Sequence, residues 1–449
     1  MDTAQLAAFV IETEEHAIPD GARRRARDAV LDSLGVAIGG VGEEPARIAV
    51  RYAESTGAAK AVPLWGMQTR TAPADAAFVN AISGHALDFD DSLPSLCGHP
   101  SVPLCATGFA AAAGCGISGL AFLSAFVLSL EVAGKISRAL EHGHYGKGWH
   151  PTSTVGVFST TAMAARLMGL NTLQLRHAFG IAAAQSAGMV RNFGTMAKPF
   201  QAGHAARAGY MAAWLAREGM TASDTILEGP RGYIAAYGDA HSDLTVPAPG
   251  DPWEIFEPGI YVKRWPCCYG NHRALAGIFA LMDGHQITPD EVVRVDVGFL
   301  PDADKALIHK DPRTALAAKF SIEYCAAAAI VDGKVTLGSF TDAAVMRPDI
   351  RQVMTRIMRV PMPGEGSFSG VVGYTDVTIV TPRGAFGTRI DQTPGSPGAP
   401  MTPQDRREKF MGCTLAVLGR DRAEALLGAV EGFAQVADVD AVAALTVPA

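Results

Sequence analysis

The chain has 449 residues, of which 48% are hydrophobic and only 18% are charged. This balance excludes a disordered or fibrous protein, and the length predicts two or three domains around a large buried interior. The net charge of −7 provides no basic field for phosphate backbones or anionic lipid, so we expect neither nucleic acid nor a membrane as a partner.

The cysteines and the N-terminus predict a cytoplasmic protein. The seven cysteines are odd in number, form no Cys-x-x-Cys pair and have apolar neighbours, a pattern typical of a reducing compartment. The N-terminal residues MDTAQLAAFVIETEEH carry acidic side chains early, with no basic flank before an apolar run. They do not resemble a secretory signal peptide.

The first half of the chain has the periodicity of packed helices. From Asp2 to about Arg51, apolar residues recur three and four positions apart, and a glycine pair ends the pattern. Alanine-rich segments of the same kind follow. The run from Ser92 to Leu130 has no charged residue, but prolines and glycines divide it, so it predicts two buried helices after a loop rather than a membrane span.

After about residue 260 the pattern changes. The segments VVRVDVGFL and YTDVTIVTPRG alternate apolar and polar residues, as half-buried strands do. Two helical segments lie between them, SIEYCAAAAIVDG and one around Arg351–Met358. The segment DQTPGSPGAPMTPQD is a turn cluster or linker, and helical periodicity returns from Arg406 to Leu445.

These elements predict a mainly α protein with a large all-helical domain and a smaller α+β domain. We expect residues 1–260 to form the helical domain, residues 261–395 the α+β domain, and residues 396–449 to return to the helical domain.

Four clusters combine titratable residues with glycine or proline in apolar surroundings, where burial perturbs pKa values most. The first is GHALDFDDSLPSLCGHP, residues 84–100. If a helix continues through it, His85, Asp88 and Asp91 or Ser92 share one face, and the loop returns His99 to them. A solvated, capped helix end is the alternative, and a Mg²⁺ site for a diphosphate is a remote one, because no second acidic cluster accompanies it.

The second cluster is GHYGKGWHPTSTVG, residues 143–156. Tyr145, Lys147 and His150 lie close together, just before hydroxyls that could cap a helix beginning near Ser153. Such a helix start, with Thr152 in it, is also a ready site for a carboxylate. The alternative is a capped loop whose lysine and tyrosine face solvent.

The third cluster, RNFGTMAKPFQAGHAAR at residues 191–207, places Lys198 among apolar side chains. Desolvation would depress the pKa of this lysine and make it a base or a strong partner for a carboxylate. His204 and Arg207 lie one helical face apart and are explained as well by packing and a surface ion pair.

The fourth cluster is KRWPCCYGNHRALAG, residues 263–277. The adjacent Cys267 and Cys268 have no obvious base beside them and predict packing, whereas His272 at a helix start is the better candidate. Further on, Tyr324 lies in an alanine-rich helix, where its hydroxyl needs a partner.

No GxSxG, HExxH, GxxxxGK[ST] or strand-linked GxGxxG motif occurs, which argues against nucleotide and zinc sites. The remaining His, Lys, Tyr and Asp residues suit proton transfer at a carbon next to a carboxylate, with no metal and no cofactor.

Taken together, the motifs HALDFDD…HP, WHPTSTVG, GTMAKPFQAGHAAR and RWPCCYGNH resemble the MmgE/PrpD family, in order and spacing, over most of the chain. That family includes 2-methylcitrate dehydratase, cis-aconitate decarboxylase and iminodisuccinate epimerase, which need no cofactor and act on small polycarboxylates. The resemblance implies a helical domain, an α+β lid, an active-site cleft between them and a homodimer.

The resemblance also implies roles for individual residues. The positions that match the family's active-site residues are Asp88, Ser92, His99, His150, Lys198, His272 and Tyr324. Ser92 stands where the decarboxylase pattern has threonine, and the loop to His99 is one residue longer. We expect His99, His150, Lys198, His272, Tyr324 and Tyr145 to be catalytic, and Asp88, Ser92, Lys147, Thr152 and Arg273 to bind the substrate.

The favoured function is proton abstraction and return at a carbon α to a carboxylate, most like iminodisuccinate epimerase. The altered loop and the extra proton carriers Tyr145 and Lys147 favour it. The main alternative is a lyase of the same family, either a decarboxylase of cis-aconitate type or a dehydratase. A helical binding module without catalytic activity is the remote alternative.

Overall fold

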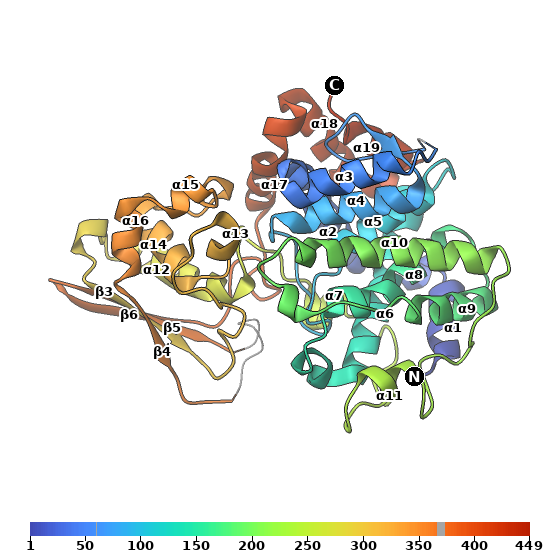
Figure 1. Cartoon of the computed structure of the whole chain (residues 1–449), viewed down its shortest axis with the longest axis horizontal. Coiled ribbons are helices and arrows are strands. Elements are labelled where there is room, and N and C mark those ends of the chain that lie inside the picture. The colour runs from blue at the N-terminus through green and yellow to red at the C-terminus, as the bar shows by residue number, and fades with distance from the viewer. Residues whose placement is uncertain (60, 366–372) are drawn as a thin grey trace. The chain divides into compact units, whose positions relative to one another are not determined.

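The computed structural model describes residues 1–59, 61–365 and 373–449. The chain is mainly α-helical, as the sequence predicts, and it divides into two compact units. The first unit contains residues 1–261 and 402–449, and the second contains residues 262–401 (Figure 1). Each unit is described by itself below.

The first unit consists of packed helices. Its helices are α1 (Thr3–Glu12), α2 (Asp20–Gly39), α3 (Glu44–Ser55), α4 (Pro73–Ala86), α5 (Ser101–Ala112), α6 (Gly119–Gly146), α7 (Pro151–Thr154), α8 (Gly156–Leu167), α9 (Thr172–Ala183), α10 (Ala197–Arg217), α11 (Tyr233–Tyr237), α17 (Pro403–Leu418), α18 (Arg420–Glu431) and α19 (Asp440–Leu445). The prediction of an all-helical domain misses one detail, a two-stranded antiparallel ribbon of β1 (Val62–Pro63) and β2 (Arg70–Thr71).

Helix α4 lies at the centre of this unit. All of its residues from Asp75 to Ala86 are buried, and it packs against α2, α3, α5 and α10. Small residues allow this close packing. On α10, a Cβ added at Gly203 would lie 2.7 Å from the main-chain oxygen of Phe78 on α4. The C-terminus of α4 is therefore held firmly, and the first candidate cluster begins there.

The C-terminal helices return to this unit. Helix α17 packs against α2, from the other end of the sequence (Figure 1). Its start is fixed by a capping box, in which the Thr402 hydroxyl accepts a hydrogen bond from the Asp405 N–H and the Asp405 carboxylate accepts one from the Thr402 N–H. Residues 396–401, expected with these helices, belong instead to the second unit.

The segment without charged residues, Ser92 to Leu130, contains a loop, helix α5 and the start of α6. One stretch of α6, Gly119–Glu141, is long and apolar enough to cross a membrane, but 89% of its most apolar window is buried inside the protein. That burial is typical of a core helix.

The second unit contains a four-stranded sheet with helices on one face (Figure 1). Its elements are α12 (His272–Gly284), β3 (Arg294–Phe299), α13 (Ala315–Ala318), α14 (Ile322–Asp332), α15 (Asp342–Val345), α16 (Pro348–Met354), β4 (Ile357–Pro361), β5 (Thr375–Thr381) and β6 (Gly384–Ile390). The strand order is β4-β3-β5-β6, with β3 and β4 parallel and the other pairs antiparallel.

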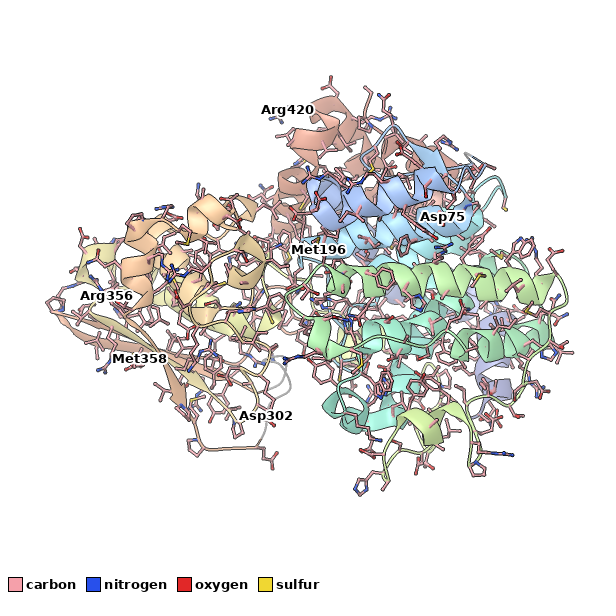
Figure 2. The ribbon with its side chains drawn as sticks, viewed as in Figure 1. Asp75, Met196, Asp302, Arg356, Met358 and Arg420 are labelled. Carbon is pink, nitrogen blue, oxygen red and sulfur yellow. The ribbon has the colours of Figure 1, made fainter. Side chains whose placement is uncertain are left out.

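The sequence analysis misjudged one segment of this sheet. The helix expected around Arg351–Met358 ends at Met354, and Ile357–Pro361 forms strand β4, on which Met358 is 48% exposed (Figure 2). An edge strand with few buried side chains lacks the regular alternation by which strands are recognised.

Candidate active site

The first cluster is built on a sharp turn at the end of α4. The helix does not continue to Asp91, as one prediction required, but ends at Ala86, and Asp88 adopts a left-handed conformation with φ of 53°. Aspartate tolerates that conformation better than most residues. The turn brings Asp90 back to the ring of His85, so a hydrogen bond rather than a helical face joins these side chains.

The aspartates of this turn are buried, so the alternative of a solvated helix end does not hold. Asp88, Asp90 and Asp91 are each at most 3% exposed. The Lys198 ammonium, from the first turn of α10, forms an ion pair with the Asp88 carboxylate and lies 5.1 Å from the centre of the Phe193 ring. The structure thus joins the first and third clusters through two buried, opposite charges.

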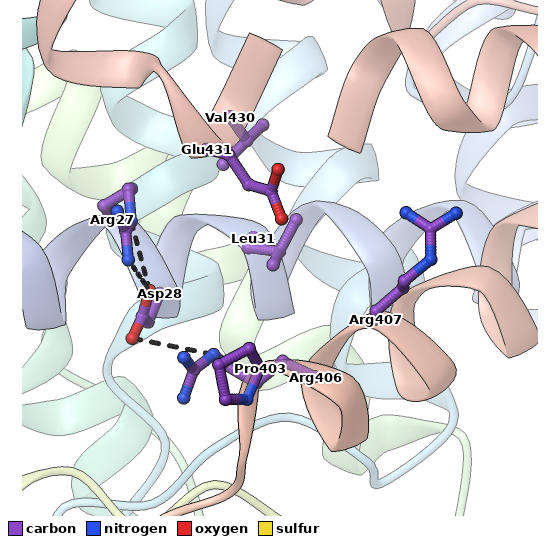
Figure 3. A pocket seen from close by; sticks show the side chains of 8 residues that line it. All are labelled: Arg27, Asp28, Leu31, Pro403, Arg406, Arg407, Val430 and Glu431. Carbon is purple, nitrogen blue, oxygen red and sulfur yellow. Dashed lines mark hydrogen bonds and ion pairs between the residues drawn. The ribbon is translucent and has the colours of Figure 1, made fainter. Parts of the chain in front are cut away.

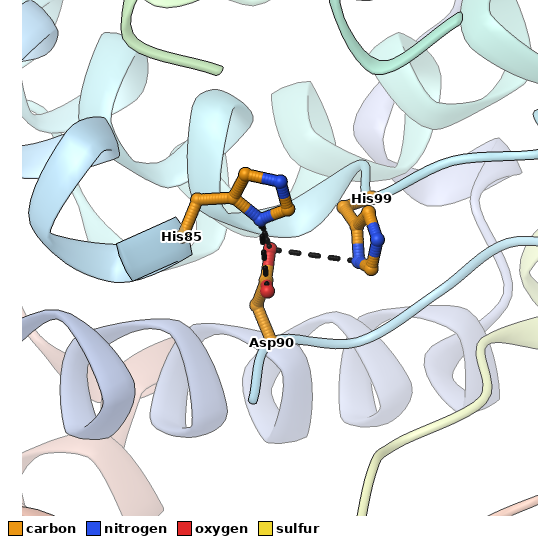
Figure 4. A group of neighbouring side chains, drawn as sticks. All are labelled: His85, Asp90 and His99. Atoms are coloured by element: carbon orange, nitrogen blue, oxygen red, sulfur yellow. Dashed lines mark hydrogen bonds and ion pairs between the residues drawn. The ribbon is translucent and has the colours of Figure 1, made fainter. Parts of the chain in front are cut away.

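Two histidines share Asp90 (Figure 4). The Nδ1 atom of His85 lies 2.8 and 3.0 Å from the two carboxylate oxygens of Asp90. His99 donates its Nδ1 hydrogen to the main-chain oxygen of Asp91 at 2.7 Å, and the same nitrogen is 3.7 Å from Asp90. The centres of the two imidazole rings are 4.6 Å apart.

His150 adds a third imidazole. Its ring plane is inclined by 26° to that of His85, with centres 6.2 Å apart. Nδ1 of His150 is 3.2 Å from Oε1 of Gln201. The Gln201 amide nitrogen donates to the main-chain oxygens of Met189 and Ala197, so Oε1 is the atom that faces the ring. His150 therefore donates its Nδ1 hydrogen, and its Nε2 carries the lone pair.

Burial keeps two of these imidazoles neutral. It lowers the pKa of His85, although the nearby Asp90 charge opposes this effect. It also lowers the pKa of His150 well below its usual value, and repulsion from Lys198, and from His85 whenever that ring is protonated, acts in the same direction. The cluster thus places neutral proton acceptors beside a lysine ammonium.

Small residues hold the loop that carries His99. The His99 N–H donates to the Thr152 hydroxyl at 3.0 Å, and a Cβ added at Gly98 would lie 2.6 Å from that hydroxyl oxygen. Ser92 pairs with Tyr261 through main-chain hydrogen bonds of 2.9 and 2.8 Å. Thr152 and Ser92 thus fix the loop, and the helix expected to begin near Ser153 begins at Pro151.

A second buried ion pair lies beneath the turn. The Lys409 ammonium, from α17, is 2.6 Å from the Asp32 carboxylate and donates to the main-chain oxygen of Phe89 at 2.8 Å. Burial, followed by the charge of Asp32, raises the pKa of Asp91 to about 8. Asp91 is therefore protonated at neutral pH, and its carboxyl accepts a hydrogen bond from the Ser101 N–H at 3.4 Å.

Side-chain atoms of His85, Asp90 and His99 lie within 4.8 Å of one another, close enough to hold a metal ion. However, Nδ1 of His85 and Nδ1 of His99 already donate to oxygen acceptors. A cation bound through these Nδ1 atoms would have to replace both hydrogen bonds, whereas binding through the Nε2 atoms would leave them in place.

Two further candidates of the second cluster are Lys147 and Tyr145. Lys147 is exposed, and its ammonium donates to the main-chain oxygen of Gly238. Tyr145 is half-buried in the last turn of α6. The hydrogen bonds of Lys147 do not connect it to His150 or Lys198.

The second unit carries the remaining candidates. His272 is the first residue of α12 and is fully buried, with Nε2 3.4 Å from the main-chain oxygen of Cys267. Arg273 donates from Nε to the main-chain oxygen of Asp391 at 3.3 Å. The Tyr324 hydroxyl donates to the main-chain oxygen of Ser339, and burial raises the pKa of Tyr324.

The expectation that no base lies near Cys267 is wrong. Burial alone would raise the pKa of this thiol, but hydrogen bonds with Cys325 and His272, and the charges of His272 and Lys263, outweigh burial and lower it. His272 follows Cys267 by five residues, and the turn between them brings the two together. All seven cysteines are free thiols.

Several residues of the buried cluster were not selected from the sequence. His85 was noticed but left without a role, and Asp90, Gln201, Asp32 and Lys409 were not chosen. Gln201 follows Lys198 by three residues on one helix, so helical spacing could have identified it. Asp32 and Lys409 are far apart in the sequence, and no local pattern connects them.

A separate surface pocket of about 200 Å³ lies between α2, α17 and α18 (Figure 3). It is lined by Arg27, Asp28, Leu31, Pro403, Arg406, Arg407, Val430 and Glu431. Its arginines pair with acids, as Arg27 does with Asp28 and Arg407 with Glu424. None of the predicted site residues lines it.

Comparison with known proteins agrees with the motifs. The MmgE/PrpD N-terminal domain model matches residues 4–243, and the C-terminal domain model matches residues 265–435. The chain belongs to the MmgE/PrpD family. Family members are enzymes, and the similar curated proteins include cis-aconitate decarboxylases, which are lyases.

The cis-aconitate decarboxylase of Mus musculus is 28% identical, over 97% of this chain and 91% of the relative. The Homo sapiens enzyme is also 28% identical, over 94% of this chain and 89% of its own length. The Aspergillus terreus enzyme is 24% identical over 79% of this chain and 77% of its own.

The raised pKa of Asp91 predicts how Asp91→Asn changes stability with pH. An unfolded aspartate loses its proton near pH 4, whereas folded Asp91 keeps it to about pH 8, so this residue contributes less stability as the pH rises through that window. Asparagine cannot ionise. The free energy of unfolding of Asp91→Asn, relative to wild type, should therefore increase by about 1 kcal/mol per pH unit between pH 5 and 8.

Urea unfolding at four pH values measures this difference. The control is Asp421→Asn, at an exposed residue of α18, which should follow the wild type at every pH. Parallel curves for Asp91→Asn and wild type would mean that Asp91 is ionised in the folded protein.

Proposed function

We propose that this protein is a cofactor-independent decarboxylase of cis-aconitate or a closely related tricarboxylate. The observation that carries the proposal is the group of three imidazoles, two of them buried, beside one buried ammonium, in a chain that aligns with cis-aconitate decarboxylases over nearly its whole length. The sequence patterns favoured epimerisation, but these relatives support the lyase alternative better. Decarboxylation therefore replaces epimerisation as the proposed reaction.

The chemistry of cis-aconitate defines what the site must do. The bond between the CH₂ carbon and its carboxylate breaks, CO₂ leaves, and the electron pair forms a new double bond to the central carbon. The former double-bond pair moves to the CH carbon, which takes up one proton. The trianion thus consumes one proton and gives CO₂ and the dianion itaconate.

Lys198 suits the binding part of this reaction. Its ammonium is held by Asp88 in a buried setting, where an electrostatic interaction with a substrate carboxylate is stronger than in water. The same charge would stabilise the electron pair that develops as CO₂ leaves. His150 and His99 carry imidazoles close enough to the same region to accept or donate protons.

We also assign roles to residues whose support is the family resemblance, for Ser92, His272 and Tyr324, or their sequence cluster alone, for Tyr145, Lys147, Thr152 and Arg273. His272, Tyr324 and Tyr145 are proposed proton carriers, and Arg273, Lys147, Ser92 and Thr152 are proposed contributors to substrate binding. The loop contacts of Ser92 and Thr152 favour indirect contributions from these two residues. A cytoplasmic location fits the absence of disulfides among the seven cysteines.

A homodimer is a further part of the proposal, and the outer face of α10 supports it. Met196, Phe200, Met211 and Trp214 are 40–50% exposed at helical spacings on this helix. Tyr52 of α3 adds to the same surface, because Arg207 stacks on its ring at 5.5 Å. Large exposed apolar surfaces are typical of protein interfaces.

The first test of the proposed reaction follows cis-aconitate by NMR in D₂O. We expect itaconate and CO₂ in equal amounts, with one deuterium at the CH₂ carbon that derives from the former CH carbon. Iminodisuccinate should remain unchanged in the same assay.

Deuterium exchange and stereochemical scrambling of iminodisuccinate, without loss of CO₂, would reject decarboxylation in favour of epimerisation. A new conjugated acid formed from a hydroxy tricarboxylate by loss of water would favour dehydration instead.

The buried ion pair predicts the behaviour of Lys198 variants. Lys198→Met alone leaves the Asp88 carboxylate buried without its ammonium and should destabilise the fold by about 3–5 kcal/mol. The double variant Lys198→Met/Asp88→Asn has no such charge and should fold, yet its kcat should fall by about 10²-fold or more. Thermal melting and the itaconate assay measure the two effects.

In this experiment Lys334→Met, in the second unit, is the control for loss of a surface lysine, because Lys334 is exposed. A double variant that melts normally and keeps wild-type kcat would show that Lys198 serves only packing.

The proposed dimer predicts a change of mass on substitution in the α10 face. Light scattering should give twice the chain mass for the wild type and the single-chain mass for Phe200→Glu/Trp214→Glu, because charges in a dimer interface oppose association. Leu173→Glu, an exposed apolar residue on α9, is the matched control and should stay dimeric. A monomeric wild type would contradict the proposal.

A further inference from the structure

We infer that His85, backed by Asp90, is the general acid that protonates the substrate carbon after CO₂ has left. This inference rests on the proposed decarboxylation and assigns a catalytic residue and its positioning residue, neither of which received a role from the family resemblance. It comes from the hydrogen bonds of the three imidazoles, from their burial and from the charge of their partners.

The tautomer of His85 is fixed by its partner. An ionised carboxylate can only accept hydrogen bonds, so the Nδ1 atom, at 2.8 and 3.0 Å from the Asp90 oxygens, carries the hydrogen. Nε2 then carries the lone pair. Among the residues that the structure describes, no group hydrogen-bonds to this Nε2 atom, although the side chain is fully buried. A buried acceptor without a partner is costly and is often found where a ligand binds.

The surroundings of this Nε2 atom are those of the candidate site. The His85 ring lies 4.6 Å from that of His99 and 6.2 Å from that of His150, measured between centres. The charges of Lys198 and Asp88 act on its titration, in opposite directions. His85 therefore belongs to the same buried group as the residues that the sequence motifs identify.

The three imidazoles differ in what accepts their Nδ1 hydrogen. For His85 it is a carboxylate, for His99 the main-chain oxygen of Asp91, and for His150 the amide oxygen of Gln201. A carboxylate stabilises a protonated imidazole far better than a neutral oxygen does, because the hydrogen bond becomes one between opposite charges. Within the part of the chain that the structure describes, His85 is thus the imidazole best suited to hold an added proton.

The proton balance of the reaction requires such a group. Arrival of a tricarboxylate places negative charge beside His85, which favours uptake of one proton from solvent at Nε2. When the CH₂–carboxylate bond breaks and CO₂ leaves, the Nε2–H bond breaks and its hydrogen forms a C–H bond at the former CH carbon. His85 returns to its neutral form, and the net reaction consumes the one proton that the stoichiometry demands.

His85→Gln and Asp90→Asn test this assignment in the full-length protein. His85→Gln should lower kcat by about 10²-fold or more, with KM changed less than about threefold. Asp90→Asn gives His85 a neutral acceptor like that of His150. It should lower kcat and move the alkaline limb of the kcat profile to lower pH, because an imidazole without the carboxylate loses its proton earlier.

Ser83→Ala is the matched control, since Ser83 is buried on the same helix and its hydroxyl has no partner among the described residues. It should keep wild-type kcat and the wild-type pH profile. Wild-type kcat in folded His85→Gln, or an unmoved alkaline limb in active Asp90→Asn, would overturn the assignment.

NMR of ¹⁵N-labelled histidines tests the assignment without relying on turnover. The free protein should show an imidazole with hydrogen on Nδ1 and a bare Nε2, whose signals are absent in His85→Gln. Saturation with tricarballylate, a saturated tricarboxylate, should protonate that Nε2 in the wild type but not in Asp90→Asn. An Nε2–H tautomer in the free protein, or no protonation by bound tricarballylate, would contradict the role of His85.

These measurements separate the two proposals. A wild-type protein that leaves cis-aconitate unchanged rejects the decarboxylase function, whatever the variants do. If the wild type turns over cis-aconitate rapidly and His85→Gln is fully active, only the assignment of His85 as the general acid is rejected.

Discussion

The ion pair between Asp88 and Lys198 is the interaction on which the site depends. Two charges that are taken out of water must be paired, or the fold loses several kcal/mol. Because the two residues are 110 positions apart, their pairing holds the turn after α4 against the first turn of α10. The turn then brings Asp90 to His85, and the start of α10 brings Gln201 to His150.

Around this pair, the ammonium of Lys198 lies beside the neutral imidazoles of His85 and His150 rather than beside further permanent cations. A cluster of permanent cations would bind a polycarboxylate tightly, but it would also bind the dianion expected from the proposed reaction and many other anions. Neutral imidazoles that gain protons only when negative charge arrives respond to the substrate itself. Burial lowers the pKa values of His85 and His150 from the ordinary value of histidine, which fits this arrangement.

Local patterns predicted the helices, the mainly α class and strands β3 and β5, because apolar periodicity reflects which face is buried. They failed at β4, where few side chains are buried, and at Asp88, where a left-handed residue ends α4. The motifs placed His99, His150 and Lys198 in candidate clusters, but not the hydrogen bonds that distinguish one histidine from another. The role of Asp90 could not be predicted from neighbouring residues, because only the folded turn at Asp88 brings its carboxylate to His85.

Lys409 makes the site depend on helix α17, which follows α4 in the chain by more than three hundred residues. This lysine lies beneath the turn that carries Asp88 and Asp90, yet it is made more than three hundred residues after them. On the ribosome, helices α2 to α10 emerge long before α17, so the turn lacks its lower support while most of the chain is being synthesised. Until then Asp32 lacks the ammonium of Lys409. The geometry of the turn is therefore completed only when α17 packs against α2.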